Sequence, residues 1–125
     1  MKRFCLILLV ATPCLFSTHS AFAVDCANAD TTSDMIECAD KDYRIADQAL
    51  NRAYGAFKKT VDAAGNELLL NAQRAWLKFR DANCNLAADQ ARGGTMAPLL
   101  QIGCMTGMTK DRTKELNELV KGLGQ

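Results

Sequence analysis

Cysteines carry the most evident chemistry in this chain of 125 residues. Two of the six lie in an apolar N-terminal segment, and the other four are Cys26, Cys38, Cys84 and Cys104. An even number of cysteines in a small domain outside the cytosol is typical of disulfides. A zinc site is the alternative interpretation, but no Cys-x-x-Cys pair occurs in the sequence. We therefore predict two disulfides and no metal.

The residues needed for nucleophilic or metal-assisted catalysis are missing. The single histidine, His19, lies in the N-terminal segment, and the only serine beyond residue 23 is Ser33. A Ser-His-Asp or Cys-His arrangement and an HExxH site are therefore excluded in residues 24–125. Paired carboxylates could support the hydrolysis of glycosides. Most acids, however, fall on polar helix faces and loops, where exposure to solvent is enough to account for an acidic residue. We predict a protein that is not an enzyme and has no cofactor.

The first 23 residues have the form of a secretory signal. Lys2 and Arg3 precede the apolar run 5–11, which is too short to span a bilayer, and Ala21-Phe-Ala23 is a cleavage motif. Pro13 stands before Cys14, where a lipoprotein signal requires a small residue. We predict a signal peptide over 1–23, cleavage after Ala23, and a domain over 24–125 that is periplasmic or secreted.

The charge of the predicted domain is nearly balanced but unevenly placed. Thirteen Lys and Arg stand against fourteen Asp and Glu, which argues against a nucleic-acid partner. The acids concentrate near the start, where Lys41 is the only basic residue among them. This acidic segment would suit a cationic partner, although acids are also favoured at a helix N-terminus whatever the partner. Its members are Asp25, Asp30, Asp34, Glu37, Asp40 and Asp42.

Three amphipathic helices must position these residues. The apolar periodicity predicts helices over about 34–61 and 67–92, and a third that begins after Thr95. Asp34 opens a capping box, Gly65 suits a left-handed cap between the first two helices, and Thr95 caps the third. No strand pattern and no segment long enough to span a membrane follows the signal. We predict an all-α fold, a small disulfide-stapled three-helix bundle with up-down-up topology.

The second predicted helix contains the only tryptophan. An apolar stripe runs along it at helical spacing, and a row of other residues lies beside the stripe. We predict that the stripe packs against the other helices and that Cys84 is structural. The stripe is Leu69, Ala72, Trp76, Phe79 and Leu86, and the row beside it is Gln73, Arg80 and Cys84.

The register of antiparallel helices selects among the three disulfide pairings. Cys84 and Cys104 are each ten residues from Gly94, so they lie at the same level. Cys38, reflected through the first turn, falls roughly 12 Å from Cys84 at 1.5 Å per residue. A disulfide tolerates about 7 Å between Cα atoms. The favoured pairing is therefore Cys84–Cys104 with Cys26–Cys38.

The same register predicts two interior contacts. Asp47 falls within a turn of Arg80, which predicts an ion pair, and Arg112 falls beside the Trp76 ring. The alternative interpretation is that Arg80 and Arg112 form an exposed clamp for a ligand.

Several of these residues together resemble a known family. The pattern resembles the LprI-like lysozyme inhibitor domain over about Cys26 to Val120. The resemblance implies an exported, disulfide-bonded helical domain of the bacterial envelope, with the matched residues Asp47, Leu50, Asn51, Tyr54, Gln73, Trp76, Arg80 and Arg112 as determinants of the fold. The pattern is Cys38-Ala, Asp47-x-x-Leu50-Asn51-x-x-Tyr54, Gln73-Arg-Ala-Trp76-x-x-Phe79-Arg80-Asp-x-x-Cys84, Gly93-Gly94-Thr95, Cys104 and Thr109-x-x-Arg112-Thr-x-x-Leu116.

The resemblance also implies binding and inhibition of a lysozyme. The leading hypothesis is a protein that covers a lysozyme cleft, with the acidic segment as the first candidate contact. The bend over 88–97 is a second candidate contact, for which a plain turn is the alternative. The alternative function is a non-catalytic envelope interaction or stress-tolerance module with another envelope protein as its partner.

Overall fold

A computed structural model describes residues 24–123. Three long helices run antiparallel to their chain neighbours: α1 (Thr32–Lys58), α2 (Ala63–Ala88) and α3 (Ala97–Leu123). Two short 3-10 helices, η1 (Cys26–Asn28) and η2 (Asp89–Ala91), lie before α1 and after α2. No strand occurs within these residues. The predicted all-α, up-down-up bundle is therefore correct. The predicted signal peptide lies outside the described residues.

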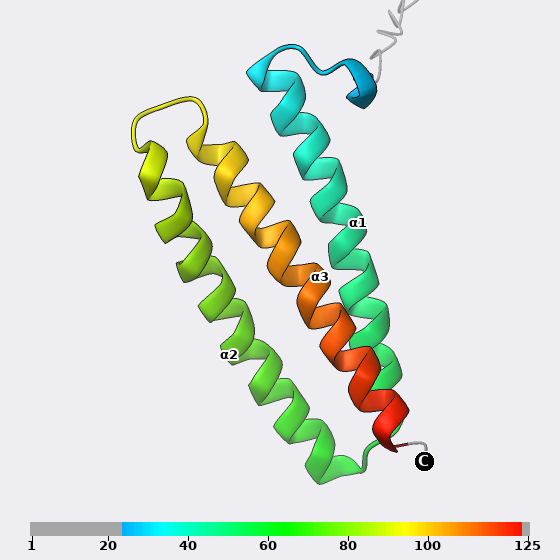
Figure 1. Cartoon of the computed structure of the whole chain (residues 1–125). Coiled ribbons are helices and arrows are strands. Elements are labelled where there is room, and N and C mark those ends of the chain that lie inside the picture. The colour runs from blue at the N-terminus through cyan, green and yellow to red at the C-terminus, as the bar shows by residue number, and fades with distance from the viewer. Residues whose placement is uncertain (1–23, 124–125) are drawn as a thin grey trace, which may run out of the picture.

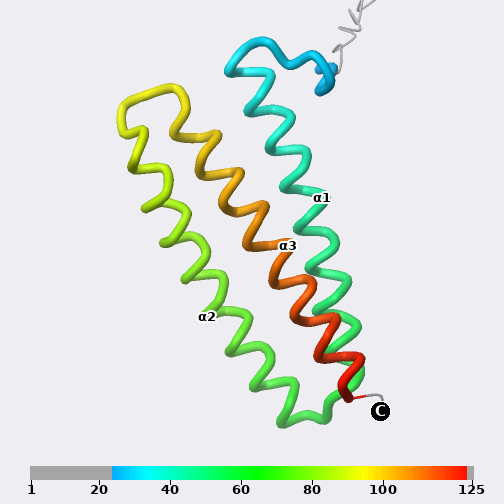
Figure 2. Tube along the Cα trace, in the orientation of Figure 1, coloured from blue at the N-terminus to red at the C-terminus, as the bar shows by residue number. Residues whose placement is uncertain are grey.

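The helices form a row with α3 in the middle (Figures 1 and 2). α3 packs along α1 and also against α2, whereas α1 and α2 make little backbone contact with each other in the described part of the chain. None of the helices described here has an apolar stretch long enough to cross a membrane. The arrangement means that α2 is held to the bundle mainly through α3.

α1 begins two residues earlier than the capping-box prediction. Thr31 is the N-cap, and its hydroxyl accepts a hydrogen bond from the Asp34 amide at 3.1 Å. Asp34 therefore lies in the first turn, where its negative charge interacts favourably with the positive end of the helix dipole. The helix ends at Lys58 and not at 61, because the amide and the hydroxyl of Thr60 both donate hydrogen bonds to the Phe57 carbonyl and close a turn there.

The turn between α1 and α2 is built differently from the prediction. Gly65 lies inside the first turn of α2 and does not have a positive φ. Asp62 is the N-cap of α2, and its carboxylate accepts from the Gly65 amide at 2.8 Å. A Cβ on Gly65 would come within 2.9 Å of the Val61 Cβ. Glycine is therefore suited to this position by close approach, not by a left-handed cap.

The turn between α2 and α3 follows the predicted glycine break. Gly93 adopts the left-handed region with φ of 78°. α3 then begins at Ala97, where the Met96 carbonyl accepts the first helical bond from the Leu100 amide at 3.0 Å. Met96 therefore holds the N-cap position, and the prediction that Thr95 caps this helix is wrong.

The hydrophobic core lies among α1, α3 and the first half of α2. Its buried residues are Leu50 and Ala53 of α1, Leu69 of α2 and Leu116 of α3. Tyr54, Phe57 and Trp76 pack against this cluster and remain partly exposed. The core is small for three helices, which leaves a large share of the stability to the disulfides and polar contacts.

The buried face of α2 is not the predicted apolar stripe. Leu69, Arg80 and Cys84 are buried, whereas Phe79 and Leu86 are exposed. The row that includes Gln73, Arg80 and Cys84 turns toward α3, because Cys84 is bonded to that helix and Arg80 contacts groups of both other helices. Only Leu69 and Trp76 of the stripe lie on or near the buried side.

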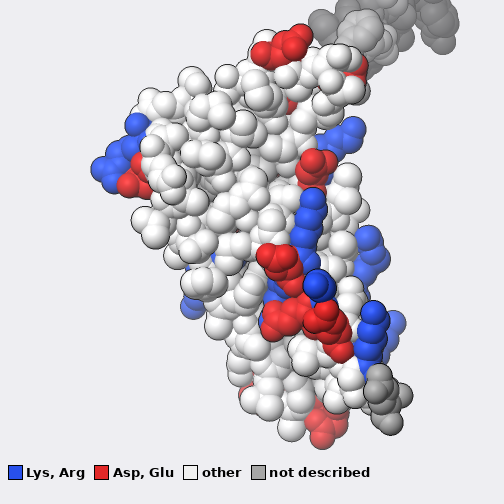
Figure 3. Space-filling model, viewed as in Figure 1, with Lys and Arg blue, Asp and Glu red and all other residues white. Residues whose placement is uncertain are grey.

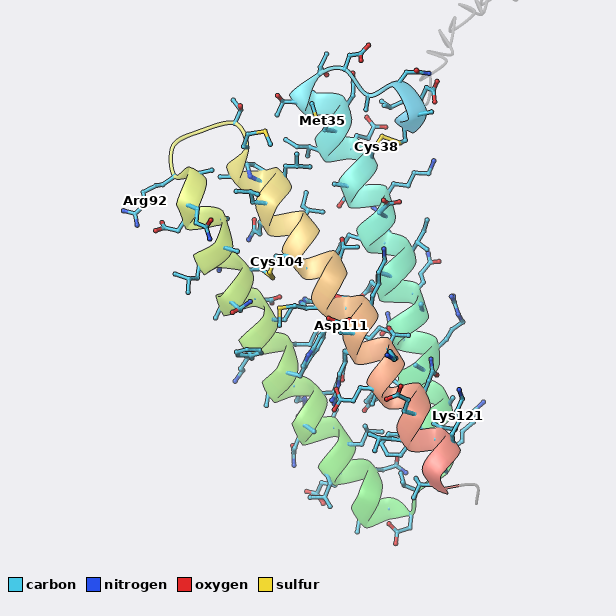
Figure 4. All side chains as sticks on the ribbon, viewed as in Figure 1. Met35, Cys38, Arg92, Cys104, Asp111 and Lys121 are labelled. Carbon is cyan, nitrogen blue, oxygen red and sulfur yellow. A yellow bond between two sulfur atoms is a disulfide. The ribbon has the colours of Figure 1, made fainter. Side chains whose placement is uncertain are left out.

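Both disulfides join the predicted partners. Cys84 of α2 bonds Cys104 of α3 with the two Cα atoms 5.5 Å apart, and Cys26 bonds Cys38 with 5.6 Å. Figure 4 shows Cys104 on the side of α3 that faces α2. These bonds leave none of the four cysteines as a zinc ligand.

Candidate functional site

A buried arginine lies at the centre of the polar contacts. The Arg80 side chain is only 6 % exposed. Its Cζ lies 5.3 Å from the centroid of the Trp76 ring and 5.6 Å from that of Tyr43. Its Nη1 also donates a long hydrogen bond of 3.5 Å to the Thr109 hydroxyl. Arg80 therefore links all three helices in the interior through cation–π and polar contacts.

The ion-pair partner of Arg80 is its neighbour in sequence. Nε and Nη2 donate to Oδ1 of Asp81 at 2.9 and 2.7 Å. The predicted pair with Asp47 is wrong, since that carboxylate accepts from Asn51 Nδ2 at 3.0 Å instead. The prediction assumed that α1 and α2 pack directly against each other, whereas α3 is the helix that packs along α1.

Tyr43 brings a titratable group to this cluster. Burial raises the pKa of the Tyr43 phenol above its ordinary value, and the carboxylates of Asp47 and Asp81 raise it further. The Arg80 guanidinium acts in the opposite direction and lowers this pKa. The phenol therefore stays neutral at physiological pH and serves as a packing surface for the guanidinium.

Substitution of Asp47 tests this assignment of partners. Asp47→Ala removes one exposed hydrogen bond, so we expect the free energy of unfolding to change by less than about 0.5 kcal/mol. Asp81→Ala removes both carboxylate bonds of a buried guanidinium, so we expect a loss of about 1–2 kcal/mol. Urea unfolding of the two variants measures both values. A larger loss for Asp47→Ala than for Asp81→Ala would contradict the assignment.

A second arginine approaches the same tryptophan, as the register predicts. The Arg112 Cζ lies 6.0 Å from the Trp76 centroid. Its Nε donates to Gln73 Oε1 at 3.2 Å, and its Nη1 pairs with Glu115 Oε2 at 2.8 Å. Both guanidinium groups are thus largely buried and are bonded to groups of the bundle itself, with their carboxylate partners at the surface. This favours a structural role over an exposed clamp.

The structure places the remaining matched residues on α1. Leu50 is in the core, Tyr54 packs against it, and Asn51 is exposed and bonded to Asp47. Four contact residues of the cluster were not predicted: Tyr43, Asp81, Thr109 and Glu115. Asp81 and Thr109 both stand in the matched pattern, and Glu115 lies one turn from Arg112, so these three could have been indicated by the sequence.

An apolar groove opens at the end of the bundle where α1 meets α2. It measures about 420 Å³ and is lined by Phe57, Val61, Leu68, Leu116 and Leu119, among others. The Arg112–Glu115 pair forms its polar edge. The groove offers an apolar surface of side-chain size, without a nucleophile or a histidine among its lining residues.

The acidic segment occupies the opposite end of the bundle. Asp25, Asp30, Glu37 and Asp42 are exposed, and Asp34 and Asp40 are partly buried. Figure 3 shows acidic side chains at this end of the molecule. Over residues 24–44 the six acids face only Lys41 and Arg44, which leaves this end strongly negative.

Two of the acids have local partners that explain them without a ligand. Asp25 is the N-cap of η1 and accepts from Asn28 Nδ2 at 2.7 Å and from the Ala27 amide at 3.0 Å. The Asn28 hydrogen bond, followed by the Ala27 amide, lowers the pKa of the Asp25 carboxyl. Asp40 accepts from Arg44 Nε at 2.8 Å. The exposed acids Asp30, Glu37 and Asp42 are therefore the candidates for contact with a partner.

The second predicted contact, the bend over 88–97, lies at the same end of the bundle as the acidic segment (Figure 1). Its surface carries the Asp89–Arg92 pair, with Arg92 Nε 2.6 Å from Asp89 Oδ1. The hydrogen bonds that Arg92 donates to the Asp89 carboxylate raise the pKa of Arg92. Figure 4 shows Arg92 projecting away from the bundle. The two predicted contacts are thus brought to one end of the molecule.

Comparison with known proteins assigns the family. The model of the family described as "Lysozyme inhibitor LprI" matches residues 24–116. The chain belongs to the LprI family. The match spans both disulfides, the arginine–tryptophan cluster and the last core residue, Leu116.

Two relatives of this LprI-family chain cover most of its length. One is the uncharacterized protein R02472 of Rhizobium meliloti (strain 1021), 41% identical over 110 residues that cover 78% of this chain and 79% of the relative. Another is the uncharacterized protein YecT of Escherichia coli (strain K12), 30% identical over 123 residues that cover 82% and 76%. No solved structure matches the chain.

Proposed function

We propose that this protein is an exported lysozyme inhibitor that binds a lysozyme and covers its cleft. The observation that carries the proposal is the family match, which extends over most of the chain. The protein would act without catalysis, since inhibition requires only a surface that fills or caps the substrate cleft. Residues 24–125 contain no histidine and a single serine, in agreement with a binding role.

The acidic end is the proposed contact surface. Lysozymes are commonly cationic, and they cleave a sugar polymer with two carboxylates in an open cleft. An end of the bundle with six acids against two basic residues would attract such a partner and accelerate the encounter. The adjoining bend over 88–97 would extend the contact with Arg92 and the surrounding backbone.

Export is part of the proposal. The family match starts at Val24, directly after the predicted cleavage motif. The two disulfides require an oxidising compartment such as the periplasm or the exterior of the cell. Both compartments also give access to lysozymes that attack the cell wall.

The direct test is the lysis of peptidoglycan by a panel of lysozymes, with and without the oxidised protein. Dose-dependent protection against one lysozyme class would support the proposal. Protection against none of them, from protein with both disulfides formed, would contradict it and favour an interaction or stress-tolerance module of the envelope. Capture of a defined envelope protein would then become the next measurement.

Neutralising the exposed acids tests the proposed surface. The triple variant Asp30→Asn, Glu37→Gln, Asp42→Asn is expected to slow association with a cationic lysozyme by about tenfold at low salt. The difference should shrink as ionic strength rises toward 0.15 M, where the Debye length is about 8 Å. Stopped-flow or surface-based kinetics measure the association rate.

A matched control keeps the net charge change but moves it along the chain. Glu67→Gln, Asp111→Asn and Glu118→Gln neutralise three exposed acids outside the acidic segment. This control should retain most of the wild-type association rate. Equal slowing in both variants would show that the overall charge, and not the acidic end, determines the rate.

A further inference from the structure

An exposed apolar stripe runs along α2, beside its buried row and turned toward solvent; at one end, Leu68 and Ala72 also line the apolar groove. It is formed by residues at alternating steps of four and three, which keeps them on one side of the helix. Leu68, Phe79 and Leu86 are 72%, 61% and 71% exposed. No charged residue interrupts the stripe. Its members are Leu68, Ala72, Ala75, Phe79, Ala82 and Leu86, and all of them are exposed.

The position of α2 explains why this side stays uncovered within one chain. α2 lies at the outside of the row of helices, and its backbone packs mainly against α3 (Figure 2). Its buried row, Leu69–Arg80–Cys84, is turned toward α3, and the disulfide between Cys84 and Cys104 prevents α2 from rotating to bury the stripe instead. A continuous apolar stripe on an outer helix marks an interaction surface.

The order of residues in the stripe is symmetric about position 77. Leu68 corresponds to Leu86, and Ala72 corresponds to Ala82. At the centre, the small Ala75 corresponds to the large Phe79. An antiparallel second copy of the same helix would therefore place leucine against leucine, alanine against alanine, and each Phe79 ring over an alanine of the other copy. Such self-complementarity is what a two-fold interface requires.

We propose that the protein forms a homodimer through this stripe, with the two α2 helices antiparallel. The stripe covers 18 residue steps, about 27 Å of helix. Leu68 also lines the apolar groove, so Leu86 of the second copy would lie at the edge of that groove and add to the contact. The acidic segment lies in the first turns of α1 and in the residues just before it, at the far side of α3 from α2, and stays open to a partner in each copy.

The exposed area sets the strength of this association. Phe79 and the two leucines expose on the order of 250–300 Å² per copy, from the areas typical of such side chains. A stable complex buries about 800 Å² per partner, so the alanines and bordering residues must supply the remainder. The large side chains of the stripe thus account for less than half of a standard interface, so we expect a weak dimer with a dissociation constant in the micromolar range.

Salt separates this contact from the proposed lysozyme contact. Lys78 borders the stripe close to its centre of symmetry, so the two-fold axis brings the Lys78 side chains of both copies near each other. Screening reduces their repulsion. Dimerisation should therefore hold or strengthen as salt rises, whereas binding of a cationic lysozyme by the acidic end should weaken.

Sedimentation equilibrium of the oxidised protein tests the proposal, from low micromolar to several hundred micromolar concentration. The wild-type protein is expected to pass from monomer to dimer within this range. Phe79→Glu is expected to weaken the dimer by at least about thirtyfold, as for a central hot-spot residue. Ala75→Glu, which places the charge opposite Phe79, should have a similar effect.

Ile45→Glu provides the matched control. Ile45 is a large apolar residue of α1 with a similar exposure of 57%, but it lies outside the stripe. This variant should dimerise like the wild type, and circular dichroism should show all three variants folded. A wild-type protein that stays monomeric throughout overturns the proposal, and so does a dimer unaffected by Phe79→Glu. The proposal is also overturned if the protein is monomeric and Phe79→Glu abolishes lysozyme inhibition. In that case the stripe would be a contact surface for the lysozyme.

Discussion

Removal of the disulfide between α2 and α3, by the double substitution Cys84→Ala and Cys104→Ala, is expected to lower the free energy of unfolding by about 3 kcal/mol. The bond closes a segment of 20 residues, for which the loss of unfolded-chain entropy has about this size. Because α2 packs mainly against α3 and buries only Leu69, Arg80 and Cys84, few other contacts replace the bond. We expect α2 to lose its protection from hydrogen exchange first.

The second disulfide provides the comparison. Cys26→Ala with Cys38→Ala removes a bond that joins η1 to the first turns of α1, at the edge of the bundle. The N-terminal segment then also gains freedom in the folded state, so we expect a smaller loss of about 1 kcal/mol. Urea unfolding followed by circular dichroism measures both. Equal losses for the two bonds would contradict the view that α2 depends on its attachment to α3.

Replacement of the buried arginine should be nearly as destabilising. Arg80→Ala is expected to lower the free energy of unfolding by about 2–4 kcal/mol. The substitution removes the guanidinium between the Trp76 and Tyr43 rings and leaves a gap where three helices meet. Arg80→Lys keeps the charge but loses the planar group that contacts both rings, and we expect a loss of about 1–2 kcal/mol.

Trp76 is the only tryptophan, so its fluorescence reports on this cluster directly. Arg80→Ala should shift the emission of the folded protein, in addition to lowering the urea midpoint. Arg74→Ala, an exposed arginine on the same helix, should change the stability by less than about 0.5 kcal/mol and leave the emission unchanged. A stable Arg80→Ala variant with unaltered emission would contradict the central role of Arg80.

Neither prediction depends on the proposed lysozyme partner, which makes them useful for interpreting the functional tests. A variant of the acidic segment that folds as the wild type does, with both disulfides and unaltered Trp76 emission, can be compared for binding alone. The dimer test is similarly independent, since Phe79 is outside the cluster around Arg80.

The sequence by itself determined the number of helices, their order along the chain and their alternating direction. Apolar periodicity and the breaks around Gly65 and Gly93-Gly94 predict three helices, and equal distances of Cys84 and Cys104 from the turn predict their bond. These features depend on short-range geometry, which the spacing of residues along one helix or across one turn specifies. The nearness of Arg112 to Trp76 follows from the same register, because α2 and α3 are direct neighbours.

Helix ends were predicted less well, because several polar residues compete for each cap. Thr31 takes the N-cap in place of Asp34, and Asp62 makes the cap that leaves Gly65 inside α2. In each case more than one residue near the boundary is of a type that can cap or end a helix. Only the path of the chain into the bundle decides which of them is in position.

The face that α2 buries was decided by the tertiary structure alone. Its sequence contains one row rich in large apolar residues and another with Gln73, Arg80 and Cys84, and hydrophobicity favours burial of the first. The structure buries the second, because Cys84 bonds α3 and Arg80 contacts Trp76, Tyr43 and Thr109. A helix can turn only one side toward its neighbour. The disulfide and the contacts of the buried arginine stabilise this orientation of α2 by more than is lost when a few apolar side chains stay exposed. The arrangement of the helices in space was decided in the same way, since α3 packs along α1 and lies in the middle of the row. Arg80 does reach α1, but it contacts the Tyr43 ring there and pairs with Asp81, while Asp47 bonds Asn51.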